Sequence, residues 1–226
     1  MKIVFVSSHY PSNTYFAQAT RRSFEAYTKR NNYGFYYDES VPSPDFRATH
    51  ELHYRRCIIF QKAAALFPDA DWYIWVDSDV FVNKPDVRIE DCIDLSDSNI
   101  LYHLFHEDSW DYPINTGVKI VNRKAISIEA KIYTMRNTYP WNQFPYEQKI
   151  TAEYVIPQIK GRYKINDPYL LNHILYQSRP SHNDPTKAVF VHMCNRTTDQ
   201  RNRIMNIFET ENRIIKQSED STLLSH

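Results

Sequence analysis

The stretch DWYIWVDSDVFV (residues 71–82) is the most informative part of this chain for its fold class. Large apolar residues run without interruption from Trp72 to Val76, and two aspartates, Asp77 and Asp79, follow before the apolar run resumes at Val80. A continuous apolar run of this length is typical of a strand that is buried on both faces, as in a parallel sheet. The stretch therefore predicts a central strand that ends in a pair of carboxylates.

The segments before this stretch alternate between strand and helix patterns. Apolar and aromatic runs predict strands at 2–8, 33–39 and 71–77, and apolar residues at helical spacing predict helices at 13–30 and 48–67. This order is typical of an α/β sheet with parallel central strands. Ligands of such sheets bind beyond the carboxyl ends of the strands, and Asp77 and Asp79 lie at such an end.

The rest of the chain continues as one domain without internal repeats. Further strands are predicted at 99–105, 116–123, 154–167 and 188–194, and helices at 124–137, from Glu147 onward, and at 199–217. We therefore predict a single domain over residues 1–217 and a flexible C-terminal tail over 218–226.

Composition restricts the class of protein. The 226 residues carry 27 acidic and 27 basic side chains, so bulk charge indicates neither a nucleic-acid nor a membrane partner. The three cysteines are widely spaced, which favours a reducing compartment over a disulfide framework. Since no apolar run is long enough for a signal peptide or a transmembrane segment, we expect a soluble cytoplasmic protein. The sequence does not determine the oligomeric state.

The two aspartates need a counter-charge. Carboxylates at positions i and i+2 of a strand point to the same face, where they repel each other and are costly to desolvate. A divalent cation resolves this conflict, because Mg²⁺ and Mn²⁺ prefer hard oxygen ligands and keep open positions for phosphate oxygens. The alternative is that Asp77 and Asp79 only cap a turn at the end of the strand.

Three further residues could complete such a site. Arg55 and Lys62 lie on one face of the helix that precedes the strand and could bind phosphate; otherwise they belong to a solvated helix surface. His192 ends the last buried strand, where a neutral imidazole could be a third metal ligand. A histidine in this position is otherwise a core residue.

The order of these motifs resembles a GT-A-type glycosyltransferase of the retaining α-galactosyl-, mannosyl- and xylosyltransferase family. The resemblance covers residues 50–196 and rests on five motifs in the same order: QKAAALFPDADWYIWVDSD, the INTGVKIVNR segment with Asn115, Thr116 and Gly117, the pair Glu147–Gln148, the VIPQIKGRYKIN segment, and His192 with Cys194. It implies a GT-A, Rossmann-like single domain, with a mixed, mainly parallel central sheet flanked by helices.

The resemblance also implies roles for individual residues. Asp77 and Asp79, the catalytic aspartates, would hold Mn²⁺ or Mg²⁺ together with His192. Nucleotide-sugar binding would involve cations for the phosphates (Arg55, Lys62, Arg196), residues near the base and ribose (Ser7, Ser8, His9), and Ser78, Asn115 and Gly117. Glu147 and Gln148 would line the donor-sugar and acceptor side as further catalytic residues. Trp110, Trp141 and Tyr146 are candidate sugar-stacking platforms, with core packing as the alternative.

The function implied is transfer of a sugar from a nucleotide-diphosphate sugar, with a UDP-sugar favoured, to a carbohydrate or glycan acceptor. The resemblance favours retention of the anomeric configuration; an inverting enzyme would need a carboxylate base such as Glu147 or Asp111. The eukaryotic members carry a membrane anchor, which this sequence lacks. We therefore expect a microbial or large-DNA-virus member, which could be one module of a longer polypeptide.

Two rival functions use the same aspartates. In a haloacid-dehalogenase-type phosphatase, Asp77 would be the nucleophile and Asp79 the acid/base, but Val80 and Phe81 depart from that family's motif. A non-catalytic, metal-dependent module that binds carbohydrates or nucleotides would keep the aspartates and the aromatic residues without needing cations for a leaving group.

Overall fold

A computed structural model describes residues 1–41, 49–107, 113–175 and 185–223, with only the backbone considered at 49–50 and 212–223. The central element is a six-stranded mixed sheet in the order β2-β1-β3-β6-β5-β7. Its strands are β1 (Ile3–Ser8), β2 (Gly34–Asp38), β3 (Trp72–Val76), β5 (Tyr102–His106), β6 (Ile114–Asn122) and β7 (Tyr163–Asn166). β1 pairs in parallel with β2 and β3, and β5 with β7, whereas β6 runs antiparallel to both neighbours. The predicted mixed, mainly parallel sheet is thereby confirmed.

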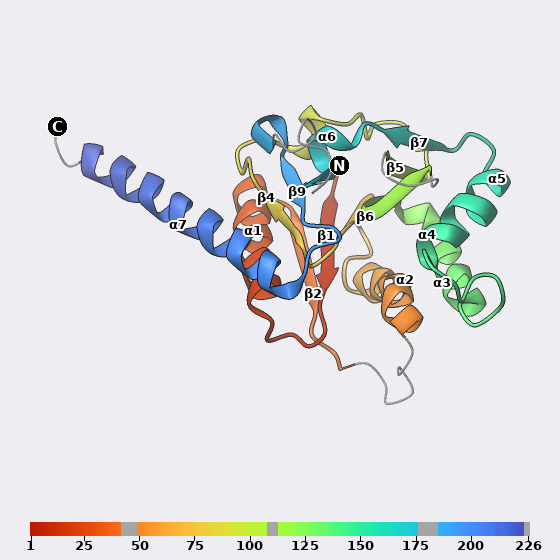
Figure 1. Cartoon of the computed structure of the whole chain (residues 1–226). Coiled ribbons are helices and arrows are strands. Elements are labelled where there is room, and N and C mark those ends of the chain that lie inside the picture. The colour runs from red at the N-terminus through yellow and green to blue at the C-terminus, as the bar shows by residue number, and fades with distance from the viewer. Residues whose placement is uncertain (42–48, 108–112, 176–184, 224–226) are drawn as a thin grey trace.

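Alternate residues of the central strands face two different cores. Val4 and Tyr73 belong to the core under α2 (Thr49–Leu66) and α3 (Ile126–Met135), while Phe5 and Ile74 belong to the core under α1 (Tyr15–Asn31). Helices α1 and α2 therefore lie on opposite sides of β1 (Figure 1). Because both faces of β3 are covered, its whole run from Trp72 to Val76 is buried, which explains the continuous apolar pattern.

A second, three-stranded sheet joins the chain just after the aspartates to a segment far along the sequence. Its order is β4-β9-β8, formed by β4 (Val80–Val82), β9 (Phe190–His192) and β8 (His173–Ile174). The apolar run that resumes after Asp79 therefore does not continue the central strand. Instead it pairs antiparallel with β9, so that Val80 lies opposite His192.

The remaining elements are short helices and one long C-terminal helix. They are the 3₁₀ turns η1 (Ile89–Asp91), η2 (Arg123–Ala125) and η5 (Pro185–Lys187), the helices α4 (Glu147–Ile150), α5 (Ile156–Gln158), α6 (Pro168–Leu171) and α7 (Thr198–Leu223), and the π-helix η3 (Thr151–Val155). Helix α7 extends away from the body of the molecule (Figure 1). No helix within the described ranges combines the length and the apolar composition needed to cross a bilayer.

Most predicted elements agree with this structure, and one does not. The strand predicted over 154–167 is helical up to Gln158, and only Tyr163–Asn166 forms a strand. Pro157 lies near the end of a helical stretch that runs without a break from α4 through the π-helix η3 into α5, and a π-helical turn is a common irregularity where a proline removes a helical hydrogen bond. The helix predicted at 199–217 continues to Leu223; the domain boundary at 217 and the flexible tail stay predictions.

Candidate active site

The two aspartates lie in a tight turn between β3 and β4, not within a strand. The Asp77 N–H donates to the Gly117 carbonyl at 2.8 Å, and the Val80 N–H donates back to the Asp77 carbonyl at 3.0 Å. This corrects the expectation that strand periodicity places both carboxylates on one face. The turn brings them together instead, at the carboxyl end of the central strand.

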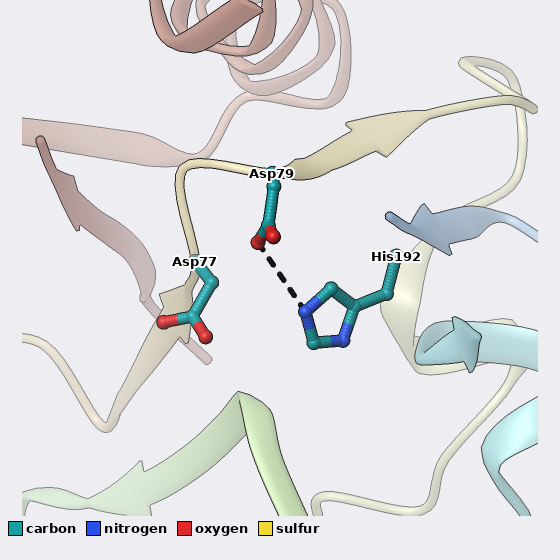
Figure 2. Close-up of side chains that lie close together, drawn as sticks. All are labelled: Asp77, Asp79 and His192. Carbon is teal, nitrogen blue, oxygen red and sulfur yellow. Dashed lines mark ion pairs between the residues drawn. The ribbon is translucent and has the colours of Figure 1, made fainter. Parts of the chain in front are cut away.

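His192 completes a cluster with these aspartates. Potential ligand atoms of Asp77, Asp79 and His192 all lie within 4.8 Å of one another. Figure 2 shows the three side chains converging from the turn and from β9. The β4–β9 pairing fixes this arrangement, and the Met193 N–H donates to the Asp79 carbonyl at 2.8 Å.

The orientation of the His192 ring follows from its neighbours. Asn172 donates its side-chain N–H to Asn115 Oδ1 at 2.9 Å, so its own Oδ1 is left to accept from His192 Nδ1 at 3.0 Å. His192 Nε2 therefore faces Asp79 Oδ1, 3.3 Å away. Burial alone would lower the pKa of His192, but the Asp79 carboxylate raises it above its usual value. A histidine held through one nitrogen with the other turned to a carboxylate has the geometry of a metal ligand with an orienting partner.

Gly117 is required by the approach of His192. A Cβ atom at this position would lie 2.1 Å from His192 Cε1 and 2.5 Å from Nδ1, inside contact distance of a ring that is held in place. The resemblance had assigned Gly117 to nucleotide-sugar binding. In this structure its first consequence is space for the histidine ring.

Two arginines that sequence reasoning missed neutralise the aspartates. Arg56 Nη2 lies 3.1 Å from Asp77 Oδ1, which also accepts the Trp75 indole N–H at 2.6 Å. Arg201 Nη2, from α7, lies 2.7 Å from Asp79 Oδ2. Burial would raise the pKa of Asp79, but His192 and Arg201 hold it well below its usual value. The sequence carried a weak signal for Arg56, which is the neighbour of Arg55, and none for Arg201.

Arg56 also connects the aspartates to a fully buried charge cluster. Its Nη1 lies 3.5 Å from Glu147 Oε2. Glu147 Oε1 is 2.5 Å from Lys119 Nζ, which in turn lies 2.8 Å from Glu129 Oε1. Thr116 donates its hydroxyl to Glu147 Oε2 at 3.1 Å, and Gln148 Oε1 accepts the Thr116 N–H at 3.1 Å. Both carboxylate oxygens of Glu147 are thus occupied, and the residue is 1% exposed.

The other predicted cations lie away from the aspartate pair. Lys62 Nζ is 3.0 Å and Arg55 Nη2 is 3.7 Å from Asp38 Oδ2, at the end of β2. Arg196 donates to the Leu175 carbonyl at 2.7 Å. Of the three, only Arg55 lines a cavity that the aspartates also line.

Of the three residues predicted near the base and ribose, Ser7 is structural, whereas Ser8 and His9 line a cavity together with Ser78, another predicted donor-binding residue. Ser7 is buried and donates its hydroxyl to the Val76 carbonyl at 2.8 Å, joining β1 to β3. His9 Nδ1 lies 2.8 Å from Ser78 Oγ, and burial lowers the pKa of this histidine. Ser8, His9 and Ser78 all line the same cavity.

Two adjoining cavities meet at the aspartates. The larger, of about 260 Å³, is lined by Glu107, Asn115, Gly117, Glu147, Gln148 and His192 among others. The smaller, of about 240 Å³, contains Ser8, His9, Arg55 and Ser78. Both are lined by His53, Arg56, Asp77, Asp79 and Arg201. Sequence reasoning missed Glu107, which accepts from Asn115 Nδ2 at 2.8 Å.

Of the three predicted aromatic platforms, two lie within the described residues, and both are packed against other side chains. Trp110, like Asp111, lies outside the described residues. Trp141 packs against Tyr154 with ring centroids 6.2 Å apart, and Tyr146 stacks on His53 at 4.7 Å. These two side chains border the core under α2, which agrees with the packing alternative.

Comparison with known proteins identifies the fold and the family. Residues 3–143 match the model of the galactosyl transferase GMA12/MNN10 family. The chain is 46% identical to a glycosyltransferase involved in the glycosylation of the major capsid of PBCV-1, covering 91% of this chain and all of that one with a TM-score of 0.86.

More distant matches support the fold alone. An active-site mutant of LgtC is 14% identical with a TM-score of 0.56, over 87% of this chain and 88% of that one. Apo GlyE of Streptococcus pneumoniae TIGR4 is 13% identical with a TM-score of 0.59, over 94% of this chain and 64% of that one. No curated protein matches the sequence significantly. The chain thus belongs to the galactosyl transferase GMA12/MNN10 family and is a glycosyltransferase with a GT-A fold.

Proposed function

We propose that this enzyme transfers a sugar from a nucleotide-diphosphate sugar, with a UDP-sugar as the favoured donor, to a carbohydrate or glycan acceptor. The observation that carries the proposal is the position of the Asp77–Asp79–His192 cluster. Its two aspartates line both adjoining cavities, so a diphosphate at this point could join a nucleoside in one cavity to a sugar in the other. The similar glycosyltransferase involved in the glycosylation of the major capsid of PBCV-1 supports glycosyl transfer as the reaction.

The donor set of the cluster fits Mn²⁺ or Mg²⁺. Two carboxylates and one imidazole suit these ions, and the Asn172 contact leaves His192 Nε2 directed toward Asp79. Asp77, Asp79 and His192 would hold the ion. When bound, it supplies electrostatic stabilisation of the charge that develops on the departing diphosphate.

Arg56 and Arg201 are the protein's own cations for the same charge. Both line both cavities, and each already contacts one aspartate. We infer that they contact phosphate oxygens of the bound donor from these positions. Arg56 and Arg201 thereby take the role in phosphate binding that the resemblance gave to Lys62 and Arg196. Arg55, which lines the smaller cavity, remains a candidate for the same role.

Retention is the proposed stereochemical outcome. The acceptor oxygen would form its bond to the anomeric carbon on the face that the diphosphate leaves, and an oxygen of the departing diphosphate would take the acceptor proton. Glu147 is a poor candidate for the base of an inverting reaction, because Lys119, Arg56 and Thr116 occupy its carboxylate. Its contacts favour a positioning role that supports Arg56.

The test is a thermal-shift screen of UDP-, GDP- and dTDP-sugars with and without Mn²⁺, followed by donor hydrolysis assays. We expect a UDP-sugar with Mn²⁺ to give the largest shift, because bound ligand stabilises the folded state in proportion to its saturation. Asp79→Asn should abolish the metal-dependent part of the thermal shift, and it should also abolish donor hydrolysis. Asp69→Asn, at an exposed aspartate paired with Lys2, is the matched control.

The outcomes separate the parts of the proposal. Hydrolysis that persists in a chelator would contradict the metal site, and a larger shift with GDP-sugars would contradict the favoured nucleotide. NMR of the product linkage decides between retention and inversion. Membership in a glycosyltransferase family leaves the phosphatase and the non-catalytic module without support.

A further inference from the structure

The loop before α4 presents one aromatic ring to the larger cavity. Phe144 and Pro145 line that cavity, and Phe144 is 62% exposed. Two other rings of the loop, Trp141 and Tyr146, are used in packing. Trp141 contacts Tyr154, and its carbonyl accepts the Tyr54 hydroxyl at 2.7 Å, which anchors the loop to α2.

The exposed Phe144 ring is held in place by a second ring of the same loop. Phe144 meets Tyr146 edge to face, with centroids 5.9 Å apart and an interplanar angle of 87°. Tyr146 in turn stacks on His53 of α2 at 4.7 Å, and its N–H donates to the Gln143 carbonyl at 2.8 Å. A ring fixed in this way loses little conformational freedom when a ligand covers it, which favours binding.

The cavity that Phe144 lines indicates which substrate its ring could contact. Phe144 lines only the cavity that contains Gly117, His192 and Glu107, and not the one at the end of β1. If the diphosphate lies where the cavities meet and the nucleoside lies beside Ser8 and His9, the larger cavity takes the sugar being transferred and the group that receives it.

The chemistry of the ring selects the kind of acceptor. Phenylalanine has no hydrogen-bonding group, so it recognises a ligand by contact with an apolar face. The C–H face of a pyranose ring offers such a surface, whereas its hydroxyl groups need polar partners, which Gln148 and Asn195 of the same cavity can supply.

We propose that Phe144 is the platform of the acceptor subsite, and that the acceptor is an uncharged saccharide whose ring stacks on it. This inference rests on the proposed glycosyl transfer. The sequence-based candidates for a platform were Trp110, Trp141 and Tyr146. Of these, Trp141 and Tyr146 support the loop, while Phe144 lines the cavity.

The experiment compares Phe144→Ala with Tyr139→Ala, which removes a ring that is 74% exposed in the same loop but does not line the cavity. The probes are methyl glycosides of glucose, galactose, mannose and xylose. Saturation-transfer NMR measures their binding without a donor, and kinetic assays measure transfer to them and hydrolysis of the donor in their absence. Phe144→Tyr tests rescue by a conservative ring.

We expect Phe144→Ala to lower kcat/KM for the acceptor about tenfold and to weaken the saturation-transfer signal, with donor hydrolysis unchanged within about twofold. Phe144→Tyr and Tyr139→Ala should behave like the wild type. Unchanged acceptor binding and transfer in Phe144→Ala would overturn the proposal. So would an equal loss of donor hydrolysis, which would assign the ring to the donor, or a wild type that binds none of the glycosides.

Failure of the proposed function gives a different result. In that case the wild type hydrolyses no nucleotide sugar, while glycoside binding and its dependence on Phe144 can still be measured by NMR.

Discussion

Two acidic pairs lie within one small region of this enzyme, and they differ in how their charge is compensated. Glu129 and Glu147 enclose Lys119, and all three side chains are at most 1% exposed. Asp77 and Asp79 instead border a cavity, and their ligand atoms converge with His192 on one point. The buried pair is complete without any ligand, whereas the aspartate pair leaves a position at which a cation from solution could bind.

Arg56 joins the two pairs, with one nitrogen toward Asp77 and the other toward Glu147. The cluster of Lys119, Glu129 and Glu147 is fully buried, so none of its side chains can move without leaving a charge unpaired. We therefore propose that the buried glutamates position Arg56 at the site, where they hold its side chain at a fixed position at the edge of the cavity. This division of roles leads to three predictions.

The largest effect should come from removing the cation of the buried cluster. Lys119→Met leaves two buried carboxylates without their partner, and we expect a loss of about 3–5 kcal/mol in the free energy of unfolding. Denaturant unfolding measures it. The matched control is Lys62→Met, because the Lys62 side chain is 41% exposed and its pair with Asp38 should contribute no more than about 1 kcal/mol. Equal losses in both variants would contradict the distinction between the clusters.

The second effect should be a stabilisation by metal that depends on the Asp77–Asp79–His192 cluster and not on the Lys62–Asp38 pair. At a Mn²⁺ concentration about 100 times Kd, the wild type should gain about 2.7 kcal/mol, or a rise in Tm of roughly 5–10 °C for a chain of this size. Asp79→Asn should lose most of this shift, and Lys62→Met should keep it. A full shift in Asp79→Asn would place the metal elsewhere.

The smallest effect should be a pH dependence of the stability that Lys119→Met loses. Burial would raise the pKa of Glu147, but Lys119 and Arg56 hold it below its usual value of 4.5. In the wild type, the stability from this group is present above about pH 4.5 and is lost as pH falls through the lowered pKa. Without Lys119, burial prevails, so ionisation of Glu147 should cost stability as pH rises.

The difference in the free energy of unfolding between the wild type and Lys119→Met should therefore be larger near pH 8 than near pH 5. Denaturant unfolding of both proteins at the two pH values measures it. A difference that stays constant over this range would mean that the charge of Glu147 does not contribute to the loss.

Much of the fold could be predicted because strand burial leaves a direct mark on the sequence. The run from Trp72 to Val76 has to be apolar on both faces of the sheet, and the two aspartates that end it are conspicuous for that reason. The segment around Pro157 was misassigned because short apolar runs fit a strand and a buried helix equally well.

The residue pattern alone predicted the central strands, a pair of aspartates at the end of one of them, and His192 as a candidate third ligand. Which cations face that pair depends on the packed structure. Neighbouring positions of a helix point about 100° apart, so Arg55 lies against Asp38 while Arg56 lies against Asp77, and nothing in the local pattern distinguishes them. Arg201 reaches Asp79 from a helix far along the chain, and Lys119 meets its glutamates across strand and helix. Such contacts join residues that are distant in sequence, because packing and not local periodicity brings them together.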